Sequence, residues 1–406
     1  MAIQQNQKRI RTTHIGSLPR PHAVLDLLKA KLNGQPYSEK VLDATVAKAV
    51  ADQVKKQVEC GIDIVSDGEM SKAGFFTYIR ERLEGFESRP NEKVALFQKE
   101  VSAFPEYYEQ YFKEAMMGGA LAPIAPVVCV GPVKYVGEAA LQKDIANLKA
   151  AAKAAGVPDE QVFMPATAAS GVGRNEYYKT EEEYFHAVAA ALRHEYEAIV
   201  AAGFLLQVDD PFLPDIFYEP GLSEEQMRRR ANLYVEATNA AIQGIPWQRV
   251  RFHTCYGINE GPRLYEASLP QIIDYVLKIN AGSYSFEAAN PRHEHEYHLF
   301  ERVKVPEGRV LIPGVITHAS NIVEHPELIA ERLLRFAKLV GRENVVAGAD
   351  CGFSSQALYR TEVHPTVVWE KFKAMRAGAD LASKWNNGVQ PGRGDIRVNR
   401  GSRCNP

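Results

Sequence analysis

Short apolar runs rich in β-branched residues alternate along the chain with long amphipathic stretches rich in alanine, glutamate, lysine and leucine. This alternation is typical of repeated strand–helix units around a parallel sheet. Eight runs predict strands, near residues 12–15, 62–66, 162–166, 205–209, 250–255, 284–287, 310–316 and 344–350. Because eight strands close an α/β barrel, the pattern predicts the (β/α)8 TIM barrel fold.

The amphipathic stretches between these runs carry helix signals. Residues 181–202 have helical periodicity, and the next stretch opens with a capping-box pattern from Ser223 to Gln226. The stretch HPELIAERLLRFAKLVG closes with Lys338 and Gly341, which are common at helix ends. Between the second and third strands we expect an insertion with extra helices, from about residue 85 to 159. We expect a single domain that spans residues 1–406. Its last residues, 386–406, should form an extended tail.

The composition narrows the classes of partner. The chain has 406 residues, which suits one barrel with insertions, and its 48 basic and 50 acidic side chains nearly cancel. No nucleic acid or other polyanion is therefore predicted as a partner. The first residues hold no apolar run for a signal peptide, and no stretch approaches the roughly 18 apolar residues of a membrane span. We expect a cytoplasmic protein without membrane contacts.

Side chains that can bind metals or take part in catalysis follow the predicted strands, at the end where barrel enzymes build their active sites. They are Ser17, Asp67, Glu69, Asp209, Asp210, His253, Cys255, Glu287, His318, Asp350 and Cys351. The five cysteines are scattered and odd in number, which favours free thiols or metal ligands over a disulfide framework.

A metal site is the sharpest hypothesis among these residues. One residue separates His253 from Cys255, so in an extended strand both side chains point to the same face. Cys351 and Glu287 hold matching positions after other strands. A nitrogen, two thiolates and a carboxylate suit Zn2+ better than Mg2+ or Ca2+. The His-x-Cys pattern alone leaves open the alternative that the pair only packs inside the barrel.

Seven motifs occur in order along nearly the whole chain: TTHIGSLPRP, DIVSDGEMSK, LLQVDDPFL, RFHTCYG, SFEAANPRHEHEY, LIPGVITHASNIVEHPE and VVAGADCGF. In these motifs the chain resembles the catalytic barrel of cobalamin-independent methionine synthase and its single-barrel relatives, which include an enzyme that opens epoxides with coenzyme M. The resemblance implies that Zn2+ is held by His253, Cys255, Glu287 and Cys351. Coordination to zinc deprotonates a thiol near neutral pH, which prepares it for alkylation.

The same resemblance implies roles for the substrate residues. Glu69 and Asp209 match carboxylates that hold the amino group of homocysteine, and the backbone that receives its carboxylate matches Ile15, Gly16 and Ser17. His318 matches a histidine that delivers a proton during transfer, and Glu287 would yield its place on the metal to the incoming thiol. The implied function is a zinc-dependent S-methyltransferase, which takes homocysteine or a similar small thiol and a methyltetrahydrofolate-type donor.

Departures from the synthase pattern keep other functions open. The stretch MPATAASGVGRNEYY lacks a tryptophan for stacking a pterin, and His14 stands where the synthase has threonine. The main alternative is a zinc-dependent epoxide:thiol alkyltransferase acting with coenzyme M, but the carboxylates Glu69 and Asp209 would repel its sulfonate. A non-catalytic, zinc-stabilised barrel and a metal-free decarboxylase of the porphyrin type are further alternatives. The sequence does not decide whether the chain forms a homo-oligomer or binds a partner protein in place of the synthase's second barrel.

Overall fold

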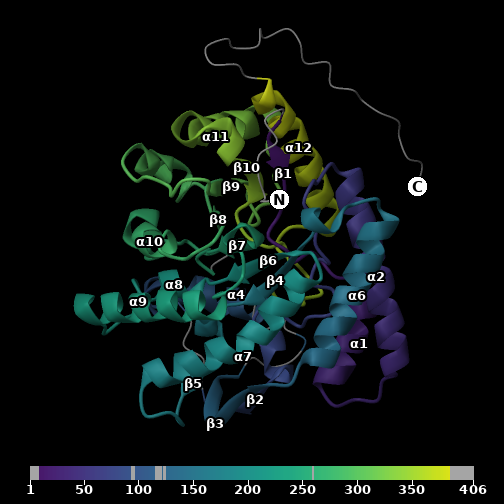
Figure 1. The fold of residues 1–406 in the computed structure, drawn as a ribbon, viewed down its shortest axis with the longest axis vertical. Helices are drawn as coiled ribbons and strands as arrows, with labels where there is room; N and C mark the ends of the chain where they lie inside the picture. The colour runs from purple at the N-terminus through teal and green to yellow at the C-terminus, as the bar shows by residue number, and fades with distance from the viewer. Residues whose placement is uncertain (1–8, 93–96, 115–120, 122–124, 258–259, 385–406) are drawn as a thin grey trace.

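The core of the fold is a curled sheet of seven parallel strands, seen at the centre of Figure 1. The structure is a computed structural model, and it describes residues 9–92, 97–114, 121, 125–257 and 260–384. In spatial order the strands are β1 (Arg11–Thr12), β10 (Val346–Ala349), β9 (Val310–Ile316), β8 (Ser283–Phe286), β7 (Val250–His253), β6 (Leu205–Asp209) and β4 (Phe163–Thr167). All neighbouring pairs run parallel, so the carboxyl ends of the strands meet at one edge.

Seven of the eight predicted strands form where the sequence predicts them, with ends that differ by a few residues. The exception is the segment 62–66, which makes two isolated parallel bridges, from Ile64 to Thr13 and from Val65 to Val162. These bridges join the segment to the two outer strands of the sheet. At the end of the segment a side chain takes the place of a neighbouring strand, because Gln57 bonds both the N–H and the C=O of Ser66.

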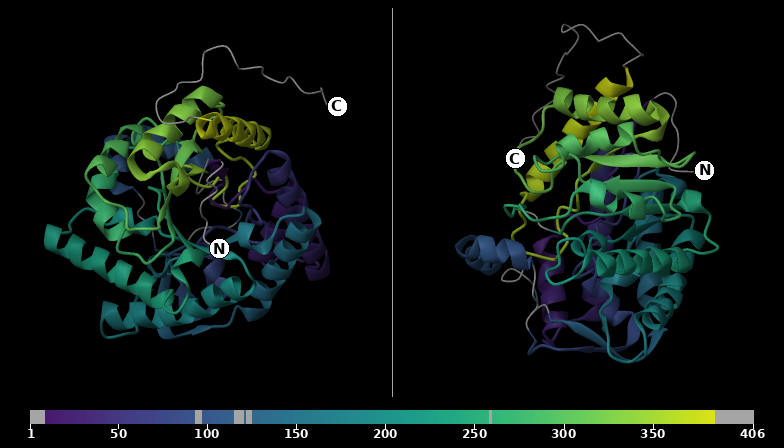
Figure 2. Two further views of the ribbon diagram at one scale, coloured as in Figure 1. Left: turned by 45° about the horizontal axis from the view of Figure 1, so that its top comes forward. Right: turned by 90° about the vertical axis from the view of Figure 1, so that its left-hand side faces the viewer.

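Helices surround the sheet in the left view of Figure 2. They are α1 (His22–Leu32), α2 (Glu39–Glu59), α6 (Glu138–Ala154), α7 (Glu181–Ala201), α8 (Phe212–Asp215), α9 (Glu224–Ala241), α10 (Leu269–Val276), α11 (Pro326–Val340) and α12 (Pro365–Ser383). The predicted helix signals are confirmed: Ser223 and Gln226 form a capping box at the start of α9, and Gly341 ends α11 with a φ of 89°. Among the described residues, no helix is both long and apolar enough to span a bilayer.

A second, small sheet lies beside the main one. It contains β2 (Leu83–Ser88), β3 (Val127–Tyr135) and β5 (Arg174–Asn175), with β2 and β3 antiparallel. Between β2 and β3 the chain forms α3 (Gln98–Ala103) and α4 (Pro105–Glu114). The expected insertion thus contains strands as well as helices, while α6 packs against α2 and α7 as part of the helical surround. The predicted tail, 386–406, lies outside the described residues.

Short 3-10 helices connect several elements: η1 (Thr77–Glu81), η2 (Asp159–Gln161), η3 (Ala169–Gly171), η4 (Trp247–Arg249), η5 (Glu294–Glu301) and η6 (Arg342–Asn344).

Buried polar side chains inside the sheet fix the backbone that follows β1. The guanidinium of Arg251 donates to Thr13 Oγ1 (3.1 Å) and to the carbonyl of His14 (2.9 Å). The ring of His14 contacts Gln57 Oε1 at 2.8 Å and accepts the N–H of Gly16 at 3.2 Å. Burial lowers the pKa of His14 to about 3, so this ring is neutral. His14 therefore holds the Gly16 turn in place, which gives a structural reason for a histidine at this position.

Candidate metal centre

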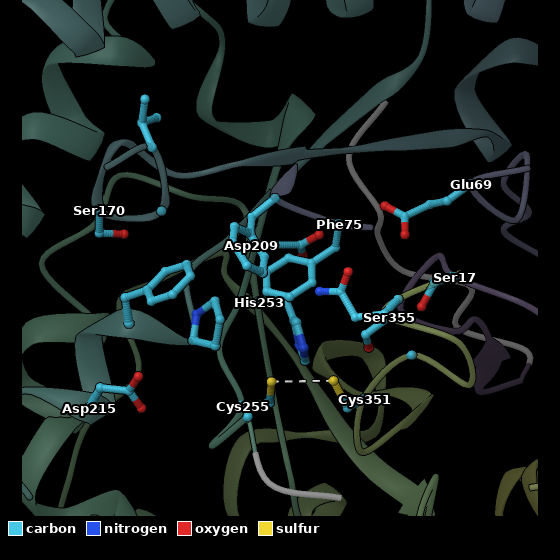
Figure 3. A pocket seen from close by; sticks show the side chains of 18 of the residues that line it. Ser17, Glu69, Phe75, Ser170, Asp209, Asp215, His253, Cys255, Cys351 and Ser355 are labelled. Carbon is cyan, nitrogen blue, oxygen red and sulfur yellow. Dashed lines mark hydrogen bonds between the residues drawn. The ribbon is translucent and has the colours of Figure 1, made fainter. Parts of the chain in front are cut away.

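One histidine and two cysteines converge at the carboxyl edge of the sheet. His253 is the last residue of β7, Cys255 follows it by two residues, and Cys351 lies two residues beyond β10. Their ligand atoms all lie within 4.8 Å of one another, and the two sulfur atoms are 3.2 Å apart. In Figure 3 the imidazole of His253 points toward the pair of thiols. All three side chains are buried.

His253 presents a free nitrogen to this cluster. Its Nδ1 lies 3.2 Å from Ser285 Oγ on β8, while its buried Nε2 has no hydrogen-bond partner among the described residues. Burial, aided by the charge of Arg251, lowers the pKa of His253 to about 3. The ring is therefore neutral, which is the form that binds a metal, and Ser285 orients it from behind.

The Cys255 thiol is held in its neutral form in the absence of a cation. The hydrogen bond from Cys351 and burial raise the pKa of Cys255 well above its usual range. A divalent metal binds cysteine as thiolate and reverses this preference. An orphaned imidazole nitrogen and two adjacent sulfurs form a borderline-soft donor set, so the residues present fit Zn2+.

Glu287, the fourth expected ligand, has its carboxylate bonded to protein groups. It follows β8 directly, and its Oε2 accepts Arg263 Nη2 at 2.6 Å and Asn290 Nδ2 at 2.7 Å. Its Oε1 accepts the backbone N–H of Tyr256 at 3.2 Å. Burial raises the pKa of Glu287 to about 7, against the opposing effect of Arg263.

Glu287 is grouped instead with His318 and Asp350, whose ligand atoms also lie within 4.8 Å of one another. Asp350 Oδ1 accepts the N–H groups of Ala288 and Ala289, each at 2.8 Å. Burial lowers the pKa of His318 to about 3. The carboxylate oxygens in this group already have donors, so we describe it as a hydrogen-bonded cluster beside the candidate metal centre.

A pocket of about 400 Å3 reaches the candidate metal centre. Ile15, Ser17, Glu69 and Asp209 line it together with the three candidate metal ligands. Gly16 forms the turn between Ile15 and Ser17 at a φ of 130°. His318 is absent from the described residues that line this pocket. The structure thus brings most of the predicted substrate residues into the pocket with the thiols, whereas His318 is grouped with Glu287 and Asp350.

Glu69 and Asp209 form an acidic pair in this pocket, above the thiols in Figure 3. Asp209 Oδ1 accepts Gln207 Nε2 at 2.8 Å, and Glu69 Oε1 lies 3.5 Å from Lys72 Nζ. The buried Oε2 of Glu69 has no hydrogen-bond partner among the described residues. Burial and the nearby charge of Glu69 raise the pKa of Asp209 well above its usual range. Such a pair favours a cationic group between its carboxylates.

Aromatic rings form an apolar wall that the sequence did not predict. The rings of Phe75, Phe76 and Phe212 have centroids 4.9 to 6.3 Å apart and line the pocket. Sequence reasoning also missed Gln207 and Ser285. Their signal was period-two spacing, since Gln207 lies two positions before Asp209 on β6 and Ser285, on β8, lies two positions before Glu287.

The chain is similar to known proteins over most of its length. Residues 10–153 and 166–370 match the family described as cobalamin-independent synthase, catalytic domain. A methionine synthase of Thermococcus kodakarensis is 24% identical over 354 residues, covering 84% of this chain and 86% of that protein. One of Sulfolobus acidocaldarius is 24% identical over 344 residues, covering 84% and 85%.

Two solved structures share the fold. The B12-independent methionine synthase of Shewanella sp. W3-18-1, in complex with selenomethionine, superposes with a TM-score of 0.68 at 21% identity, covering 93% of this chain and 98% of that one. The putative vitamin-B12 independent methionine synthase of Listeria monocytogenes gives 0.64 at 18% identity, covering 93% and 99%. At these identities the likeness shows the fold alone.

Proposed function

From the premise that the chain belongs to the family of cobalamin-independent synthase catalytic domains, we propose that it is a zinc-dependent S-methyltransferase. Its acceptor is homocysteine or a similar small thiol, and its methyl group comes from a methyltetrahydrofolate-type donor. The observation that carries the proposal is the convergence of His253, Cys255 and Cys351 at one end of a pocket whose other wall holds Glu69 and Asp209. A thiol that also carries an ammonium group suits a pocket with the candidate metal ligands at one end and this acidic pair at the other.

In this proposal His253, Cys255 and Cys351 hold Zn2+, with Glu287 as the exchangeable fourth ligand. Bound zinc would lower the pKa of the substrate thiol, so that it reacts as a thiolate. Ser285 keeps the His253 ring in the orientation that presents Nε2.

The remaining residues bind and orient the acceptor. Glu69 and Asp209 take its ammonium group, and the backbone of Ile15, Gly16 and Ser17 takes its carboxylate. Phe75, Phe76 and Phe212 give this pocket an apolar wall. Proton delivery by His318 rests on the family resemblance alone, since this residue does not line the pocket.

The proposal includes a closed eight-stranded barrel. The two parallel bridges of segment 62–66 support closure, because they connect both outer strands of the seven-stranded sheet. A closed barrel places the residues after all eight strands around one mouth.

Two alternatives receive less support. Epoxide opening with coenzyme M requires a sulfonate in a pocket that contains Glu69 and Asp209, and like charges disfavour it. A purely structural zinc site is enclosed by its ligands, whereas His253, Cys255 and Cys351 line an open pocket.

Calorimetry of the zinc-loaded protein tests the proposal. We expect homocysteine to bind with release of about one proton per site, measured by repeating the titration in buffers of different ionisation enthalpy. Coenzyme M serves as the matched thiol without an ammonium group. Binding of coenzyme M alone would refute the choice of acceptor, and failure of the protein to retain zinc would refute the whole proposal.

A further inference from the structure

The carboxylate of Glu287 has a full set of donors beside the metal centre. Arg263 and Asn290 bond one oxygen, and the N–H of Tyr256 bonds the other. Tyr256 directly follows Cys255, so this position of Glu287 lies next to the candidate ligands. If the Glu287 carboxylate leaves a metal ion, these three donors can hold it in the position seen here.

Arg263 itself is held rigidly. Its side chain is buried, and its Nε donates to Glu266 Oε2 at 2.8 Å, while the other oxygen of Glu266 contacts His293 Nε2 at 2.9 Å. Its backbone has a φ of 60°, a left-handed conformation that costs a residue with a Cβ about 1–2 kcal/mol. Only surroundings that fix the conformation can maintain it.

Strain of this kind gathers around the site. Among the described residues, the other non-glycine positions with positive φ are Glu69 and Phe97, and both line the pocket. The segment 260–268 before α10 therefore presents the guanidinium of Arg263 to Glu287 at the expense of backbone strain.

We infer that Arg263 is a positioning residue that competes with the metal for Glu287. Together with Asn290 it receives the carboxylate when a substrate thiol takes the fourth place on the zinc, and so sets how readily this exchange occurs. The inference rests on the proposed function and names a determinant of thiol affinity within it. No bond to carbon changes in this step, and the carboxylate only exchanges one cationic partner for another.

Competition fixes the sign of the effect. Without Arg263 the carboxylate is more available to the metal, so zinc binds more tightly and the thiol displaces Glu287 less readily. An arginine that only supports the fold gives the opposite result, since a loosened loop weakens the zinc site.

The experiment compares Arg263→Met and Arg263→Lys with the unmodified protein. Competition with a chromophoric chelator measures zinc affinity, and calorimetry measures homocysteine affinity of the loaded protein. We expect Arg263→Met to bind zinc about 10-fold more tightly and homocysteine about 10-fold more weakly, the effect of one charge-assisted hydrogen bond. Arg263→Lys keeps the charge but loses the fork, so it should shift both affinities in the same directions by less.

A double-mutant cycle separates this role from a general effect of charge. In a Glu287→Gln background, Arg263→Met should leave zinc affinity unchanged. The matched control is Arg82→Lys, which alters another buried arginine that pairs with Asp144 away from the metal centre. It should leave both affinities unchanged.

Weaker zinc binding by a folded Arg263→Met, or an effect that persists beside Glu287→Gln, would overturn the inference. Thermal unfolding reports whether each variant is folded, and Arg263→Lys carries the test if Arg263→Met is not. Failure of the proposed function looks different, because the unmodified protein would then bind no zinc or no homocysteine.

Discussion

Gly16→Ala should be strongly destabilising, because two separate costs meet at this turn. Gly16 has a φ of 130°, and a Cβ built on it would lie 2.5 Å from Pro165 Cγ in β4. A side chain in that backbone region costs on the order of 1–3 kcal/mol, and forcing an atom into a packed core costs about 1–3 kcal/mol more. The sum, about 2–6 kcal/mol, is a large part of the 5–15 kcal/mol or so that stabilises a typical protein.

Gly34→Ala is the matched control. Gly34 also has a positive φ, 64°, but nothing lies within 4 Å of its Cβ position. Only the backbone cost of about 1–2 kcal/mol then remains. Denaturant unfolding of both variants gives the difference, and homocysteine calorimetry should show lost affinity for Gly16→Ala alone. Equal destabilisation by the two substitutions would refute the argument that Pro165 closes the space behind Gly16.

Three further predictions follow from contacts in and around the site. Ser285→Ala removes the group that orients His253, and we expect zinc affinity to fall about 10-fold in chelator competition with no change in melting temperature. Asp209→Asn should weaken homocysteine binding about 10-fold, while the affinity for 2-mercaptoethanol, which lacks an ammonium group, stays unchanged in calorimetry. Burial opposes protonation of His293, but its two glutamate partners raise its pKa to about 9. Its contribution to stability is thus complete below its unfolded pKa of about 6.5 and is lost as the pH rises through about 9, so His293→Gln should flatten the unfolding free energy measured between pH 6 and 10.

The parts of the fold that the sequence predicts are those with a local pattern. β6 and β9 form at the predicted residues because each is rich in leucine, isoleucine or valine and is buried along its whole length. His253 and Cys255 could be paired from spacing alone. Placing Cys351 beside them required only that it also follow a strand of the same parallel sheet.

The missed features depend on contacts between distant residues. In the segment 62–66, the backbone of Ser66 bonds the side chain of Gln57 and not a neighbouring strand, and no local sequence pattern predicts this contact. β3 carries Gly131 and Pro132 in its middle, which argue against a strand in any local interpretation. Arg263 and Glu287 are 24 positions apart. Their pairing depends on the left-handed backbone of Arg263, which cannot be predicted from the sequence.

The close approach of the two sulfur atoms has a consequence for oxidative chemistry. At 3.2 Å, Cys255 and Cys351 need only a small movement to reach the roughly 2.05 Å of a disulfide. Both line the pocket, so a peroxide that enters it meets the pair directly. A coordinated cation engages the lone pairs that would attack such an oxidant. The metal would then shield its own ligands, and the metal-free protein should be the form that air inactivates.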